Sequence, residues 1–112
     1  MANRVVLIGR LTKDPELREV GDDKSNTRFI VAAKRRYTVK EGAQNADFIP
    51  VVCWNKLAEN VCTYCHKGSL VCVEGSLHSH AYDDENGQRV YSLDVNAESV
   101  EFLDTRSERE GE

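Results

Sequence analysis

The stretch FIPVVCWNKLAENVCTYCHKGSLVCVEGSL, residues 48–77, decides the fold because the spacing of its apolar residues changes twice. Residues 47–54 are apolar and β-branched, as in a strand, and Pro50 indicates an edge or a bulge there. Between 55 and 68 the apolar residues recur at i, i+1, i+4, i+5 and i+8, which forms one stripe of a helix. Residues 69–82 return to a strand pattern. The stretch therefore predicts a strand, a helix that begins at Asn55 and stops at Gly68, and a longer strand.

The flanking segments add three more strands. Gly9 and Gly75 fall inside strand patterns, where glycine indicates a bend or a bulge. Residues 12–27 are polar and are predicted as a loop, whereas Asn86-Gly87 predicts a tight hairpin. The last strand alternates clearly between apolar and polar residues. The five strands are predicted at residues 3–11, 28–37, 47–54, 69–82 and 89–103.

This order of elements favours one all-β domain. Three strands, a helix and two further strands suit an OB-fold, a five-stranded barrel whose one helix lies between strands three and four. The alternative is an α+β sheet with the helix packed on one face. We predict that the domain covers residues 1–103 and that 104–112 form a short, charged, disordered tail.

The charge is distributed unevenly along the chain. The formal net charge is −4, and the six acids and two bases of residues 98–112 account for all of it. Residues 1–40 carry ten Lys/Arg against five Asp/Glu. The excess of basic residues in the first third of the chain weakly favours an anionic partner.

The segment CTYCH, residues 62–66, has the C-x-x-C-H spacing of a haem attachment site, and it could also supply zinc ligands or a redox pair. Zinc would need a fourth ligand from Cys53, Cys72, His78 or His80. The simpler interpretation is a helix end in which Cys65 is a small buried apolar residue. We therefore expect no metal and no cofactor, and we find no catalytic motif. Without a signal peptide or a membrane span, we expect reduced cysteines and a cytoplasmic protein.

Alternation along the strands sorts the side chains into faces. Val51 and Cys53 share one face of their strand, and Phe48 and Trp54 share the other. Aromatic and basic side chains interleave on three neighbouring strands, as binding of single-stranded nucleic acid requires. The same aromatics could instead pack in the core or in a subunit interface. The interleaved set is Arg35, Arg36, Tyr37, Phe48, Trp54, His78, His80 and Tyr82.

Three segments carry a resemblance to a known family. The segments resemble, in order, the first strand and loop, the central strand–helix–strand and the final hairpin of bacterial single-stranded DNA-binding proteins. They are NRVVLIGRLTKDPELR, residues 48–77 and YDDENGQRVYSLDV. The resemblance covers about residues 1–103. It implies that bases stack on Tyr37, Phe48, Trp54 and Tyr82. It also implies phosphate contacts from Arg4, Arg10, Arg35, Arg36, Lys56, His78 and His80.

The resemblance has further consequences. It implies a homotetramer, because one chain here provides one barrel. The family often has arginine where His78 and His80 stand, which implies weaker or more pH-dependent binding. The chain stops at DTRSEREGE without the family's acidic, Phe-terminated tip, so it resembles a short or tail-less form and we do not expect docking of partner proteins through a tip.

Two functions remain open at this point. The leading prediction is sequence-tolerant binding and protection of single-stranded DNA during replication, recombination, repair or DNA uptake, with no enzymatic step. The alternative is a primosome-type replication accessory protein on the same fold that works mainly through protein contacts.

Overall fold

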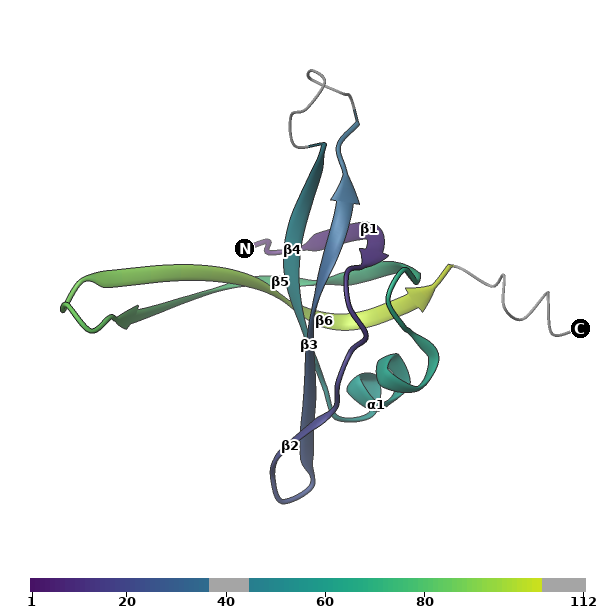
Figure 1. Ribbon diagram of the computed structural model, residues 1–112, viewed down its shortest axis with the longest axis horizontal. Coiled ribbons are helices and arrows are strands. Elements are labelled where there is room, and N and C mark those ends of the chain that lie inside the picture. Colours follow the sequence, from purple (N-terminus) through teal and green to yellow (C-terminus); the bar gives the residue numbers. More distant parts are fainter. Residues whose placement is uncertain (37–44, 104–112) are drawn as a thin grey trace, which may run out of the picture.

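Strands dominate the protein, and one helix lies between the fourth and fifth of them (Figure 1). Figure 1 shows the computed structural model, which describes residues 1–36 and 45–103. The elements are β1 (Val5–Leu11), β2 (Arg18–Gly21), β3 (Lys24–Lys34), β4 (Ala46–Trp54), α1 (Asn55–Tyr64), β5 (Leu70–Asp83) and β6 (Arg89–Phe102).

Five of the strands close on themselves. The strand order is β1-β5-β6-β4-β3-β2, and the end of β1 also pairs with β3, Arg10 opposite Ala32 and Leu11 opposite Val31. The ring β1-β5-β6-β4-β3 is therefore complete, and β2 is added outside it as the partner of β3 in a hairpin. This arrangement, with α1 between β4 and β5, confirms the prediction of an all-β OB-fold.

Two glycines sit where the ring bends. A Cβ on Gly9 would overlap the carbonyl oxygen of Ala32, just before β1 turns from β5 to β3. A Cβ on Gly75 would overlap the carbonyl oxygen of Asn96, where the β5–β6 register shifts. Glycine is needed at both positions because two backbones meet closely there. The register shift confirms the bend or bulge predicted at Gly75.

The core is made largely of valines that point into the ring. Val51 and Cys53 of β4 are fully buried, as alternation predicted. Helix α1 packs against β3, β4 and β6, and Ala58 and Val61 are its buried residues. Cys65, just after the helix, joins the same core. No helix within residues 1–36 and 45–103 has the length and apolarity to cross a bilayer.

The predicted loop at 12–27 is wrong over its second half, because β2 and the start of β3 form a hairpin there. The alternation is hidden in the sequence by small polar residues, since Ser25 and Thr27 face the core although neither is apolar. The turn passes through Asp23, whose positive φ of 57° aspartate tolerates well.

The helix is shorter than predicted. It ends at Tyr64 rather than near Gly68, because Cys65 already has an extended backbone. The prediction that Asn55 caps the helix is also wrong. The Asn55 side-chain oxygen instead accepts a hydrogen bond from the Ser25 backbone N–H, 3.1 Å away, and so ties the helix start to β3.

Candidate nucleic-acid interface

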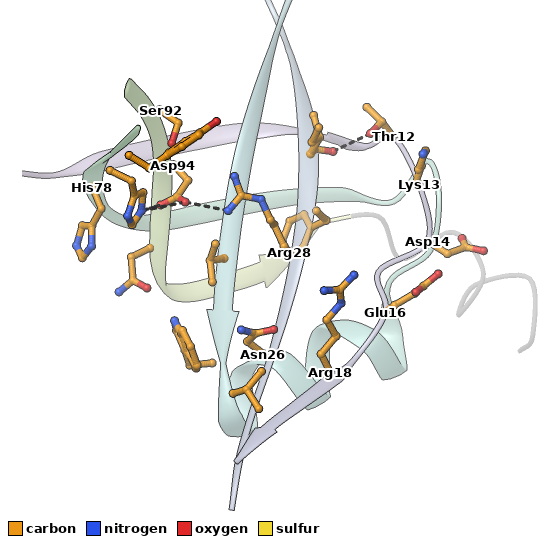
Figure 2. Close-up of a pocket in the computed structure, with 18 residues that line it drawn as sticks. Thr12, Lys13, Asp14, Glu16, Arg18, Asn26, Arg28, His78, Ser92 and Asp94 are labelled. Carbon is orange, nitrogen blue, oxygen red and sulfur yellow. Dashed lines mark hydrogen bonds and ion pairs between the residues drawn. The ribbon is translucent and has the colours of Figure 1, made fainter. Parts of the chain in front are cut away.

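An open groove of about 870 Å³ runs over the outer face of β3, β4, β5 and β6. The segment from Thr12 to Val20 lines its other side. In Figure 2, His78 and Ser92 lie at one end, Arg18 and Asn26 at the other, and Arg28 between them. The groove is only partly enclosed, so a flexible polymer can enter it.

Two predicted aromatic residues line this groove. Trp54, at the end of β4, is 41% exposed, and Tyr82, on the β5–β6 hairpin, is 56% exposed. Burial in the core would have hidden their rings, so the alternative of core aromatics is wrong for this pair. Phe48 is also exposed and lies on the same face of β4 as Trp54, but it is outside the groove lining.

The charges in the groove are balanced. Two imidazoles, His78 and His80, face it from the same side of β5, as alternation predicted. The remaining ionic side chains are three cations and three anions, so the net positive charge of the groove depends on the imidazoles. The cations are Lys13, Arg18 and Arg28, and the anions are Asp14, Glu16 and Asp94.

Most of the other predicted phosphate contacts lie away from the groove lining. Arg4 forms an ion pair with Glu98 at 2.8 Å. An Nη1–H of Arg10 donates to the Gly68 carbonyl oxygen at 2.8 Å. Arg36 and Lys56 are exposed, and the predicted stacking residue Tyr37 lies outside the described residues.

Arg35 is held by a carboxylate beside the start of β4. Its guanidinium donates to Asp47 through Nη2 at 2.7 Å and through Nε at 3.2 Å. The hydrogen bond from Arg35 is the main reason that the pKa of Asp47 is lowered. Arg35 is thus fixed at the edge of the β3–β4 hairpin rather than in the groove.

Several groove residues were missed by sequence reasoning. Arg28, Asn26, Ser92, Asp94 and Asn96 supply most of the polar floor. Arg28 opens the strand that the sequence predicted, and alternation alone would have placed it with Asn26 on the outer face. Asp94 gave no such signal, because an acid is not expected in a site for a polyanion.

Two of the four cysteines, Cys53 and Cys65, are buried, whereas Cys62 and Cys72 are partly exposed. Within residues 1–36 and 45–103, no three His, Cys, Asp or Glu side chains are placed to hold a metal ion. Burial raises the pKa of Cys53 to about 12 and that of Cys65 to about 11, and nearby Cys62 contributes to both. Thiols with raised pKa values are protonated at neutral pH and are poor nucleophiles.

Comparison with known proteins identifies a family that matches this chain. The model of the Single-strand binding protein family matches residues 2–103. The "Single-stranded DNA-binding protein" of Halalkalibacterium halodurans is 47% identical over 106 residues, which cover 95% of this chain and 63% of the relative. "Single-stranded DNA-binding protein A" of Bacillus subtilis is 47% identical over 107 residues, 96% of this chain and 62% of the relative.

A shorter relative is matched over more of its length. "Single-stranded DNA-binding protein 2" of Staphylococcus aureus is 47% identical over 107 residues, 77% of its own chain. The chain spans less than two thirds of the first two relatives. None of these relatives supports the alternative of a primosome-type accessory protein.

Proposed function

The chain belongs to the single-strand binding protein family, and from that we propose that it binds single-stranded DNA with little dependence on sequence. The observation that carries the proposal is the open groove in which Trp54 and Tyr82 expose their rings beside arginine and histidine side chains. Every base has a flat π-face, so stacking on such rings tolerates sequence. The groove needs no reacting group for this activity, and we propose no chemical step.

In the proposed complex, bases stack and cations follow the backbone. Stacking is worth about 1–3 kcal/mol per base. Lysine and arginine neutralise phosphates and release counterions, so binding weakens as salt rises. We propose that Phe48 and Tyr37 extend the stacking surface beyond the groove. The proposed phosphate contacts are Arg4, Arg10, Arg35, Arg36, Lys56, His78 and His80.

We propose that several copies assemble, as a homotetramer, to present several grooves to one strand. Two apolar surfaces on the outside of the fold support this. Val6 and Ile8 are exposed side by side on β1, and Leu77, Tyr91 and Leu93 are exposed on the face of the β5–β6 hairpin that is turned away from the groove. Contact between copies would remove such apolar surface from water.

The binding unit in this proposal is residues 1–103. Coating of a single strand would protect it and remove hairpins during replication, recombination, repair or DNA uptake. Such a role would place the protein with the nucleoid in the cytoplasm.

Tryptophan fluorescence tests the proposal directly, because Trp54 is the single tryptophan and lies in the groove. Titration with oligo-dT should quench the emission, and a plot of log affinity against log salt should have a negative slope. Duplex DNA of the same length is the matched control and should quench far less, since its bases are already stacked. Unchanged Trp54 emission together with free oligo-dT in a mobility assay would reject the proposal.

A further inference from the structure

A buried carboxylate lies at the floor of the groove. The side chain of Asp94, on β6, is only 6% exposed. Its Oδ2 accepts from Nη1 of Arg28 on β3 at 3.0 Å and lies 3.3 Å from Nε2 of His80 on β5 (Figure 2). One acid thus joins a side chain of β3 and a side chain of β5.

A desolvated acid in a site for a polyanion requires a physical reason. A buried carboxylate is costly unless charged partners satisfy it, and its charge repels phosphate. Both disadvantages are offset if the acid fixes the cations that the ligand needs. Long cationic side chains lose considerable rotamer freedom when a ligand immobilises them. A side chain that is already fixed loses less.

The strand register shows how Arg28 is held across the groove floor. Arg28 is opposite Val52 on β4, and Val52 is opposite Asn96 on β6. The Arg28 side chain therefore crosses the intervening β4 to reach Asp94 on β6. A guanidinium has five N–H donors in a rigid fork. The contact with Asp94 uses one end, and the side chain remains 56% exposed, so donors are left for a phosphate.

We propose that Arg28 is a phosphate ligand of this groove and that Asp94 is the positioning residue that holds Arg28 and His80 ready for the DNA backbone. The inference rests on the proposed DNA binding and names two residues that the sequence did not select. The charged and titratable groups that share the groove with His80 are Lys13, Asp14, Glu16, Arg18, Arg28, His78, Tyr82 and Asp94.

The first experiment compares Arg28→Ala with Arg89→Ala in salt titrations of labelled oligo-dT. Arg89 is a matched control, because it is similarly exposed and also pairs with an aspartate, Asp83, at 3.4 Å. That pair lies outside the groove lining. Arg28→Ala should weaken binding about tenfold at low salt and reduce the log–log salt slope by about 0.7. Arg89→Ala should change neither. Equal behaviour of the two variants would overturn the inference.

The second experiment tests positioning with a double-mutant cycle. Asp94→Asn keeps the shape of the side chain and removes its charge. If Asp94 positions Arg28, the loss on Arg28→Ala should fall from about tenfold to about threefold in the Asp94→Asn background. If Asp94 only neutralises Arg28, the loss should instead grow beyond tenfold. A larger loss, or the same loss in both backgrounds, would overturn the positioning role.

Two controls separate failure of this inference from failure of the proposed function. If oligo-dT quenches Trp54 and Arg28→Ala binds like the natural protein, the proposed function stands and the inference fails. If the natural protein does not bind oligo-dT at all, both the inference and the proposed function fail.

The variant Arg28→Lys is a control for misfolding of Arg28→Ala, because lysine keeps the positive charge and lacks the forked donors of the guanidinium. It should retain the salt slope and lose part of the affinity, and a slope as low as that of Arg28→Ala would contradict a phosphate contact.

Discussion

The two faces of β4 show how one strand serves two purposes. Val51 and Cys53 point into the core and are fully buried, whereas Val52 and Trp54 line the groove on the other side. Residues that are neighbours along the strand, about 3.3 Å apart, thus lie alternately in the buried core and on the solvent-facing side. The inner face stabilises the fold by burial of apolar surface. The outer face leaves Trp54 41% exposed, and this part of its surface is available to a ligand.

A substitution on the inner face of β4 should cause a large loss of stability. Val51→Ala leaves a cavity in a core that cannot fully collapse and should lower the free energy of unfolding by about 2–3 kcal/mol. Urea denaturation measures this. DNA affinity per folded molecule should be unchanged. Val52→Ala is the matched control, since the same atoms are removed from the half-exposed neighbour, and it should cost much less stability. An equal loss of unfolding free energy in Val51→Ala and Val52→Ala would contradict the difference between the two faces of β4.

A substitution on the outer face should differ from Val51→Ala by weakening DNA binding. Trp54→Ala should weaken oligo-dT binding by the stacking energy of about one base, 1–3 kcal/mol, and by a similar factor for every sequence. Trp54 is 41% exposed and so more than half buried, and its truncation should also lower the free energy of unfolding, so the affinity is compared per folded molecule. Fluorescence anisotropy of labelled DNA measures the affinity. Tyr64→Ala is the control, an exposed aromatic on α1 outside the groove lining. A comparable loss there would show that the groove is not the stacking surface.

A third effect concerns the buried thiol of the inner face. Burial raises the pKa of Cys53 to about 12. The folded protein therefore keeps a proton that the unfolded chain loses above about pH 9. Stability is fully present below that pH and falls between it and about pH 12. At pH 10 the thiol should cost about 1 kcal/mol relative to pH 8.

Urea denaturation of the natural protein and of Cys53→Ala at the two pH values measures this cost. The variant should lose less stability than the natural protein on going to the higher pH. Cys65, whose pKa is raised to about 11, remains in both proteins and contributes equally. An identical pH dependence would mean that Cys53 does not titrate with unfolding.

Much of the difference between the two faces of β4 could be predicted from the sequence. Alternation placed Val51 and Cys53 together and Trp54 opposite, and the change to helical spacing at Asn55 located the only helix of the described residues. These signals succeed because a strand with one buried face must alternate. The resemblance of three segments to a family then gave the function that the groove supports.

The failures also have a physical pattern. The β2–β3 hairpin was missed because the buried positions of β3 include Ser25 and Thr27, which fit a tight core without being apolar. The Arg28–Asp94 pair was missed because the two residues lie 66 positions apart and on strands that β4 separates. No local sequence pattern encodes a contact between residues so far apart in the chain, and an acid is not a typical residue of a site for a polyanion.

The histidines of β5 determine the charge balance within the groove, and replacing them should have a modest effect on binding. Lys/Arg and Asp/Glu are equal in number there, so His78 and His80 decide whether the groove is positive. Replacement of both with arginine, as His78→Arg with His80→Arg, adds two fixed positive charges, so it should tighten oligo-dT binding several-fold and steepen the salt slope by up to about 0.7 for each side chain that meets a phosphate.

The double variant His78→Gln with His80→Gln is the matched control, because glutamine keeps a donor and adds no charge, and it should not steepen the salt slope. Fluorescence anisotropy of labelled oligo-dT over a range of salt concentrations measures both variants. If the arginine variant kept the affinity and the salt slope of the natural protein, the side chains at positions 78 and 80 would not meet the DNA backbone. Asp14 and Glu16, which line the groove from the Thr12–Val20 segment, would then be the next positions to replace, because removal of their charge makes the groove more positive without any change on β5.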